Sequence, residues 1–142
     1  WGGNYFNLPP SRGFLVWDKK QPENFSLAMC EQAWWSRDAN AKVFRKSVTS
    51  YEKQHPTQKP VALAAWCFEQ YGDKCETVVD LFGGSGSTLI ACEQKKKTGY
   101  IMELSGSYVD VIVSRWQTFT GKQATLESSG ATFEQVAADR KT

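Results

Sequence analysis

The sequence is poor in the residues that build metal and redox sites. It has one histidine, His55, and four cysteines, none of which form a Cys-X-X-Cys pair. Because zinc sites need closely spaced cysteine and histidine ligands, we expect no metal site, and free thiols in a reducing compartment. The sequence also has no long apolar run and no signal peptide, so the expected location is cytoplasmic, without a membrane segment.

An excess of charge of either sign is missing as well. Lys and Arg number 17 against 15 Asp and Glu, which gives a formal net charge of +2. Overall charge therefore does not by itself indicate a nucleic-acid binder. Aromatic residues, by contrast, make up 13% of the chain and include six Trp, which favours large packed surfaces. A chain of 142 residues most simply forms one domain with its own core.

The most informative stretch contains a glycine-rich turn. An apolar run that stops at Asp80 belongs to a strand predicted over residues 77–82, and a helix is predicted from Ser87 to about Gln94. A strand, a glycine loop and a helix N-terminus together hold small-molecule cofactors at the carboxyl ends of strands in α/β sheets. The stretch therefore predicts a cofactor site, and a simple strand–turn–helix without a ligand is the alternative.

Three kinds of cofactor compete for this loop. A triphosphate-binding loop needs Gly-Lys followed by Ser or Thr, but no lysine lies between Asp80 and Glu93. A dinucleotide fingerprint needs a third Gly or Ala where this chain has Leu89. The remaining pattern suits S-adenosylmethionine, because its positive sulfonium and ammonium groups favour a nearby carboxylate such as Asp80. Glycines admit the methionine part close to the backbone.

A second acid supports this interpretation. Glu103 ends another predicted strand, residues 99–104, about 20 residues after Asp80. An acid at the tip of the neighbouring strand is placed to accept hydrogen bonds from a ribose. A solvated carboxylate at a strand end is the alternative.

Strands and helices alternate along the rest of the chain. Further strands are expected at residues 1–7 with a Gly-Gly turn, 13–19 and 123–126. Helices are expected at residues 61–70 with Gly72 as the stop, 108–119 with Ser105 or Ser107 as cap and Gly121 as the stop, and 132–139. Residues 28–36 suit either a strand or a short helix, and residues 37–54 have no clean period. This alternation predicts an α/β fold with a mostly parallel sheet.

A second motif precedes the glycine loop, and the two together resemble a known protein family. His55-Pro56-Thr57-Gln58-Lys59-Pro60, then a helix, then Asp80-Leu81-Phe82-Gly83-Gly84-Ser85-Gly86-Ser87-Thr88, resembles the amino-methylating DNA methyltransferases, which modify adenine N6 or cytosine N4. The order is similar to the β-type, permuted arrangement, in which the cofactor half follows the catalytic half. Residues 1–6 and 13–19 resemble strands of phage and bacterial members, including those of restriction-modification systems, and the resemblance extends through Arg115-Trp116 to about Leu126.

The resemblance implies a Rossmann-like methyltransferase fold with helices on both faces of the sheet, incomplete at its N-terminal side, and S-adenosylmethionine as cofactor. It implies these cofactor-binding residues: His55, Pro56, Thr57, Gln58, Lys59, Asp80, Phe82, Gly83, Gly84, Ser85, Gly86, Ser87, Glu103 and Leu104. Glu103 would hold the ribose, and residues 55–59 would lie beside the methionine end. His55 would act through packing and backbone contacts; a packed or exposed loop histidine is the alternative.

One departure from the family is serious. The catalytic motif, Asp-Pro-Pro-Tyr or a close variant, is missing, and Leu8-Pro9-Pro10-Ser11 lacks both the polar residue before the prolines and the aromatic after them. The chain also opens without Met on an apolar, turn-rich stretch, so we expect a C-terminal part whose catalytic motif lies upstream of Trp1. A smaller departure is Gly106, where members often have proline. Without the strand that ends in the catalytic motif, the Asp80 strand has a bare edge, which predicts a homodimer, a strand swap or a rearranged sheet.

The resemblance also divides the chain. Residues 1–126 would form a partial methyltransferase domain, with sheet strands in 1–36, a target-recognition loop in 37–54 and the cofactor half in 55–126; residues 127–142 would be a polar tail. Candidate DNA contacts are Arg37, Lys42, Arg45 and Lys46, which form a basic excess that suits phosphates, although a solvated loop is the alternative. The expected function is methyl transfer to a flipped DNA base. The alternatives are a non-catalytic cofactor- or DNA-binding remnant that works with a second chain and, third, an RNA or small-molecule methyltransferase.

Overall fold

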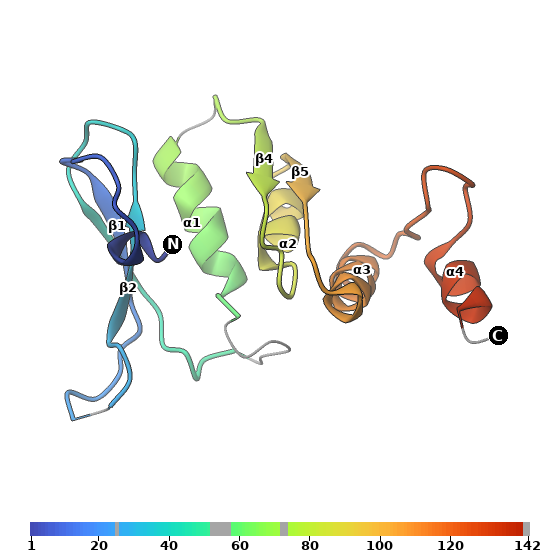
Figure 1. Ribbon diagram of the computed structural model, residues 1–142, viewed down its shortest axis with the longest axis horizontal. Coiled ribbons are helices and arrows are strands. Elements are labelled where there is room, and N and C mark those ends of the chain that lie inside the picture. The colour runs from blue at the N-terminus through green and yellow to red at the C-terminus, as the bar shows by residue number, and fades with distance from the viewer. Residues whose placement is uncertain (25, 52–57, 72–73, 141–142) are drawn as a thin grey trace. The chain divides into compact units, whose positions relative to one another are not determined.

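The computed structural model describes residues 1–24, 26–51, 58–71 and 74–140 (Figure 1). The chain divides into two compact units, Trp1–Glu52 and Lys53–Thr142. The described strands form a three-stranded sheet and a two-stranded sheet. Within the described ranges, no helix combines the length and the apolar character that a membrane span requires. Cys30, Cys67, Cys75 and Cys92 are free thiols, as the sequence predicted.

The first unit is built on a mixed sheet with the strand order β2-β1-β3. β1 (Phe14–Asp18) pairs antiparallel with β2 (Cys30–Trp34) and parallel with β3 (Lys42–Arg45). Alternate residues of β1 are buried, and the Trp17 indole N–H donates a hydrogen bond to the Lys46 carbonyl (2.8 Å). This bond fixes the segment that follows β3 against the central strand.

Two predictions for this unit need correction. Residues 1–7 are not a strand end: they contain a 3-10 helix, Gly3–Tyr5, because Gly2 adopts a left-handed φ of 78° and turns the chain. The region 37–54, which lacks a clean period, contains the strand β3. β3 has only four residues and is held by its pairing with β1, a long-range contact that local periodicity does not encode. The ambiguous residues 28–36 contain the strand β2.

The second unit alternates helices with a parallel strand pair. Its elements are α1 (Val61–Tyr71), β4 (Thr77–Asp80), α2 (Ser87–Gln94), β5 (Thr98–Ile101), α3 (Gly106–Thr120) and α4 (Phe133–Asp139). β4 and β5 lie side by side and pair in parallel, with Asp80 opposite Ile101 (Figure 1). The sequence therefore predicted the α/β class correctly, but the described sheets are smaller and less parallel than expected.

The core of the second unit joins α1, α2 and the strands. Ala65 and Phe68 of α1 pack with Ala91 and Cys92 of α2, and Val78 of β4 lies against this cluster. α2 also sits directly on β5, because a Cβ at Gly99 would come within 3.1 Å of the Cys92 sulfur. This packing fixes the end of β4, the start of α2 and the end of β5 relative to one another.

The C-terminal elements follow the local signals in part. α3 ends at Gly121, whose φ of 70° makes it the left-handed cap that the sequence predicted. α4 begins with Thr132, which forms a reciprocal capping box with Gln135. Residues 123–126 do not form the expected strand; they contribute a single bridge, Thr125 to Thr132. Ser105 is at the cap position of α3 but makes no side-chain cap bond. The expected stop at Gly72 lies outside the described residues.

Candidate functional site

A cavity of about 300 Å³ opens where the glycine loop joins β4 to α2. Its walls come from the start of α2, the ends of the two parallel strands and the segment before α1. They are formed by Gln58, Lys59, Asp80, Phe82, Gly83, Gly84, Ser85, Ser87, Thr88 and Glu103. The position is the carboxyl edge of a parallel strand pair, where open α/β sheets bind their ligands.

Asp80 is the last residue of β4, and its carboxylate bridges the loop. One oxygen, Oδ1, accepts a hydrogen bond from the Phe82 backbone N–H (3.0 Å). The other, Oδ2, accepts one from the Thr88 hydroxyl in the first turn of α2 (2.6 Å). The carboxylate is therefore held at both oxygens and faces the cavity in a fixed orientation. Thr88 was not among the predicted site residues, although a hydroxyl in the first turn of the helix after the loop was a usable signal.

Glu103 lies two residues beyond the end of β5, not at the end of the strand as the sequence predicted. Its Oε2 accepts a hydrogen bond from the Gly84 backbone N–H (2.7 Å), and its Oε1 accepts one from the Ser105 N–H (2.9 Å). Each oxygen of this carboxylate therefore has a backbone N–H partner, and Glu103 also lines the cavity. Glu103 thus both anchors the glycine loop and offers an acceptor beside it.

The loop lies so close to the end of β5 and to α3 that positions 83 and 86 have no room for a side chain. A Cβ at Gly83 would come within 2.5 Å of Ile101 Cγ2 and 3.0 Å of Ile112 Cδ1. Gly86 has a φ of 79°, and a Cβ added there would lie 3.1 Å from Ile112 Cγ2. Only glycine satisfies both the backbone angle and the space at Gly86. The glycines at positions 83 and 86, which suggested a cofactor loop, are therefore required by the packing.

An unsatisfied polar atom on the wall points to a polar occupant. The Ser87 side chain is 9% exposed and lines the cavity, yet its hydroxyl has no hydrogen-bond partner among the described residues. Buried hydroxyls are costly when unpaired, so such an atom at a cavity wall indicates a ligand or water contact. Ser87 is also the first residue of α2, where the helix dipole adds partial positive charge.

The two carboxylates and the donor end of α2 together define what the cavity can bind. Asp80 and Glu103 disfavour a phosphate group, and they favour positive charge and hydroxyl donors. In the described part of the chain, no group of three or more His, Cys, Asp or Glu is arranged to hold a metal ion. The residues present fit a small organic molecule that carries both a cationic centre and hydroxyl groups.

The remaining predicted cofactor residues fall into three groups. His55, Pro56 and Thr57 lie outside the described residues. Gln58, which is buried, and Lys59, which is half-buried, lie on the cavity wall. Gly86 and Leu104 do not line it: Gly86 is the N-cap of α2, beneath the loop, and the Leu104 side chain is fully exposed.

The four predicted DNA contacts lie in the first unit in different surroundings. The Arg45 guanidinium is 3.5 Å from the Asp18 carboxylate, and the Arg37 guanidinium lies over the Trp35 ring at 5.8 Å from its centroid. Lys42 and Lys46 have no carboxylate within ion-pair distance in the ranges that the structure describes. Two of the four positive charges therefore have local partners already.

The comparison with protein families finds a match over most of the chain. The sequence model of a family described as DNA methylase matches residues 14–114, more than half of the chain. The structure of the M1.HpyAVI–SAM complex is similar, with a TM-score of 0.59 and 24% identity over 72% of this chain and 60% of that chain. A putative DNA modification methylase from Thermus thermophilus, complexed with S-adenosyl-L-methionine, gives a TM-score of 0.48 and 18% identity.

The two structural matches cover only part of the known proteins. The likeness to the M1.HpyAVI complex establishes a shared fold. The match to the Thermus protein covers 84% of this chain and 54% of that chain, so this chain spans little more than half the length of either protein. No curated protein matches the chain.

Proposed function

This chain belongs to the N6/N4 DNA methylase family, and we propose that it carries the methyl-donor site of a DNA methyltransferase that uses S-adenosylmethionine. The target would be adenine N6 or cytosine N4. The observation that carries the proposal is the convergence of two carboxylates and an unpartnered hydroxyl on one loop-lined cavity. A β-type, permuted order is supported because residues 55–60 precede the glycine loop. Residues 1–142 contain no Asp-Pro-Pro-Tyr motif.

Each group on the cavity wall suits one part of S-adenosylmethionine. Glu103 lines the cavity with a carboxylate that would accept hydrogen bonds from the ribose hydroxyls, and Asp80 supplies negative charge that favours the sulfonium and ammonium groups. Ser87 and the first turn of α2 offer donors to the methionine carboxylate. Gln58 and Lys59 also line the cavity, and they follow the predicted contacts His55, Pro56 and Thr57 in the sequence.

The reaction that this site serves depends on position more than on acid–base chemistry. When bound, the cofactor supplies an electrophilic methyl group on a positively charged sulfur. The exocyclic nitrogen of the base would accept this methyl group, and the proton that it loses would pass to solvent. Asp80 and Glu103 fix the donor's orientation, because in-line transfer requires alignment of the reacting atoms. The target base must leave the duplex to reach the site, so base flipping is part of the proposal.

DNA contacts are proposed for the first unit, in the recognition loop of residues 37–54. Lys42 and Lys46 are the strongest candidates, since Arg45 and Arg37 already interact with Asp18 and Trp35. Such contacts to phosphates would position the duplex and would not by themselves read its sequence.

A second candidate function is supported by the open edge of β4. Among the described strands β4 pairs only with β5, and Val79 and Tyr100, which are opposite each other in this pair, have exposed apolar side chains. Exposed strand edges and apolar faces favour pairing with another chain. The chain would then act as a cofactor- or DNA-binding part that a second copy or a second chain completes, through a homodimer or a strand swap.

Titration calorimetry with S-adenosylmethionine tests the cofactor proposal directly. We expect saturable one-site binding, with no binding of ATP as the matched control, because the two carboxylates disfavour phosphates. Absence of any heat with S-adenosylmethionine would contradict the proposal. A methylation assay then separates the two functions: activity that requires an added chain with Asp-Pro-Pro-Tyr supports the second. A monodisperse monomer in light scattering would argue against assembly through the β4 edge.

A further inference from the structure

We propose that Arg115, in the middle of α3, is a positioning residue that sets the shape of the glycine loop for the methionine end of the cofactor. The proposal rests on the proposed function for the identity of the ligand. Arg115 lies outside the cavity wall, so it acts through the loop and not by touching the cofactor. Its role follows from the freedom of the loop backbone, the contacts that hold the loop, and the rigidity of α3.

The first feature is the freedom of the loop backbone. Ser85 stands between Gly84, with a φ of 54°, and Gly86, with a φ of 79°. Glycine adopts left-handed and right-handed conformations about equally well, so two glycines around one residue do not define a path by themselves. The observed conformation therefore depends on hydrogen bonds: the Gly86 N–H donates to the Gly83 carbonyl within the loop (2.8 Å), and other contacts hold the loop from outside.

The second feature is the set of contacts that hold it. Glu103 binds the Gly84 N–H (2.7 Å) on one side, while Arg115 Nη1 donates a hydrogen bond to the Ser85 carbonyl. The Ser85 residue is only 3% exposed, and a buried carbonyl needs a donor. This carbonyl shares its peptide plane with the Gly86 N–H, which donates to the Gly83 carbonyl (2.8 Å). Arg115 and that bond therefore hold the two ends of the peptide that leads into α2.

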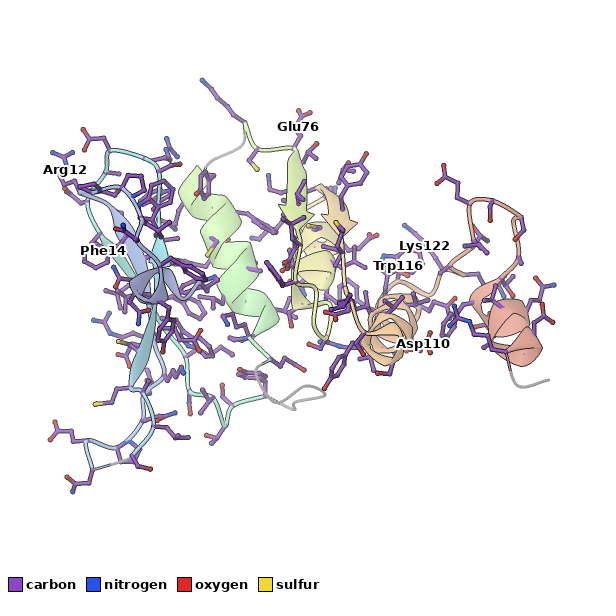
Figure 2. The ribbon with its side chains drawn as sticks, in the orientation of Figure 1. Arg12, Phe14, Glu76, Asp110, Trp116 and Lys122 are labelled. Carbon is purple, nitrogen blue, oxygen red and sulfur yellow. The ribbon has the colours of Figure 1, made fainter. Side chains whose placement is uncertain are left out.

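The third feature is the rigidity of the helix that carries Arg115. Ile112 lies three residues earlier on the same face of α3 and fills the space beneath Gly83 and Gly86. Trp116, labelled in Figure 2, donates its indole N–H to Glu93 Oε1 (2.8 Å) and ties α3 to α2. α3 is therefore a fixed support, and both Ile112 and Arg115 contact the loop from it.

The chemistry of Arg115 explains why this position uses an arginine. Burial lowers the pKa of Arg115, but a guanidinium stays charged in proteins. Within the described ranges it has no carboxylate at ion-pair distance, and its hydrogen bond goes to a backbone carbonyl. A charged donor makes a stronger bond to a carbonyl than a neutral donor does, which suits a loop that must hold its shape.

The test compares two ligands and four proteins. We would measure binding of S-adenosylmethionine and of 5′-methylthioadenosine, which lacks the amino-acid part, to the wild type and to Arg115→Met, Arg115→Lys and Arg140→Met. Arg140→Met is the matched control, because Arg140 pairs with Asp110 (3.7 Å) on the exposed surface. Amide hydrogen exchange at residues 84–87 of the unliganded proteins gives a readout that needs no ligand.

We expect Arg115→Met to weaken S-adenosylmethionine binding by about ten-fold and 5′-methylthioadenosine binding by less than about two-fold. Arg115→Lys should recover most of the affinity, and exchange at residues 84–87 should rise in Arg115→Met but not in Arg140→Met. Equal loss for both ligands without rescue by lysine, or unchanged loop exchange, would overturn the positioning role. If Arg115→Met does not fold, Arg115→Gln replaces it in the comparison with Arg115→Lys. Failure of the wild type to bind either ligand would overturn the proposed function, and the exchange data would still decide the role of Arg115.

Discussion

The two units of the chain present their predicted functional residues in opposite ways. In the second unit, the ends of β4 and β5 bring Asp80 and Glu103 to one loop, and each carboxylate is held by two hydrogen bonds. In the first unit, the predicted DNA contacts lie on or near β3, an edge strand, and Arg45 is paired with Asp18 at 3.5 Å. One region is pre-organised around a cavity, and the other is an exposed, partly neutralised surface.

This difference indicates where affinity for each ligand comes from. A fixed loop with buried polar groups gives strong and specific contacts to a small molecule, because its groups lose little freedom on binding. Exposed lysines on a strand edge give weak, salt-dependent contacts to phosphates. Substitutions in the loop should therefore have large effects on cofactor binding, and substitutions around β3 should have small effects on DNA binding.

The largest effect is expected for Glu103→Ala. This change removes the acceptor proposed for the ribose and also leaves the Gly84 and Ser105 N–H groups without their carboxylate partner. We expect the affinity for S-adenosylmethionine to fall by about 100-fold in titration calorimetry. Glu134→Ala is the control, because that exposed carboxylate accepts a hydrogen bond from Gln117 on a surface away from the cavity. Equal affinities for Glu103→Ala and the wild type would mean that the two carboxylates do not form the site.

The sequence predicted the second unit closely because its signals are local. Ser87 and Gln94 bound α2 as expected, Gly121 ends α3, and Thr132 caps α4. Each of these boundaries depends on a residue within one turn of the helix end. The loop side of the cavity followed from the same local pattern, whereas Gln58, Lys59 and Glu103 reach the wall from other segments of the second unit.

The sequence did not predict features that depend on distant contacts. β3 forms only because β1 offers a parallel edge, and residues 1–7 turn at Gly2, whose N–H binds the Gln32 carbonyl (2.8 Å). Leu104 was expected at the site, but it lies in the connection between β5 and α3, and its side chain is exposed and does not line the cavity. The supporting role of Arg115 also requires the packed structure, because it depends on a helix far along the chain from the loop.

Gly83→Ala should have the next largest effect, on stability. The added methyl would lie 2.5 Å from Ile101 Cγ2 and 3.2 Å from the Met102 carbonyl oxygen, so β5 would have to shift. Overpacking of this kind lowers the free energy of unfolding by about 2 kcal/mol, measurable as a lower urea midpoint. Gly106→Ala, where nothing lies within 4 Å, is the matched control and should leave the midpoint unchanged or raise it slightly. Similar midpoints for the two variants would show that the loop is not packed as tightly as the structure indicates.

Thr88→Val probes the orientation of Asp80 with a smaller change. Valine keeps the shape of threonine but removes the hydroxyl that donates to Asp80 Oδ2 (2.6 Å). We expect about a five-fold loss of affinity for S-adenosylmethionine, since the charge of Asp80 remains and only its orientation is freed. Thr118→Val is the control, because that hydroxyl donates to the Ser114 carbonyl within α3. If both variants bind the cofactor equally well, Asp80 does not need its second hydrogen bond.

The smallest effects are expected around β3, where they test the contrast between the two units. Lys42→Ala removes a positive charge that has no ion-pair partner among the described residues, so one phosphate contact should be lost. We expect the slope of log K against log salt concentration for duplex DNA to become less steep by about one unit, measured by fluorescence anisotropy. Arg45→Ala should change the slope less, because Asp18 already interacts with the Arg45 guanidinium (3.5 Å). A larger change in this slope for Arg45→Ala than for Lys42→Ala would show that DNA displaces Asp18 from Arg45. The side chains of the first unit would then rearrange when DNA binds.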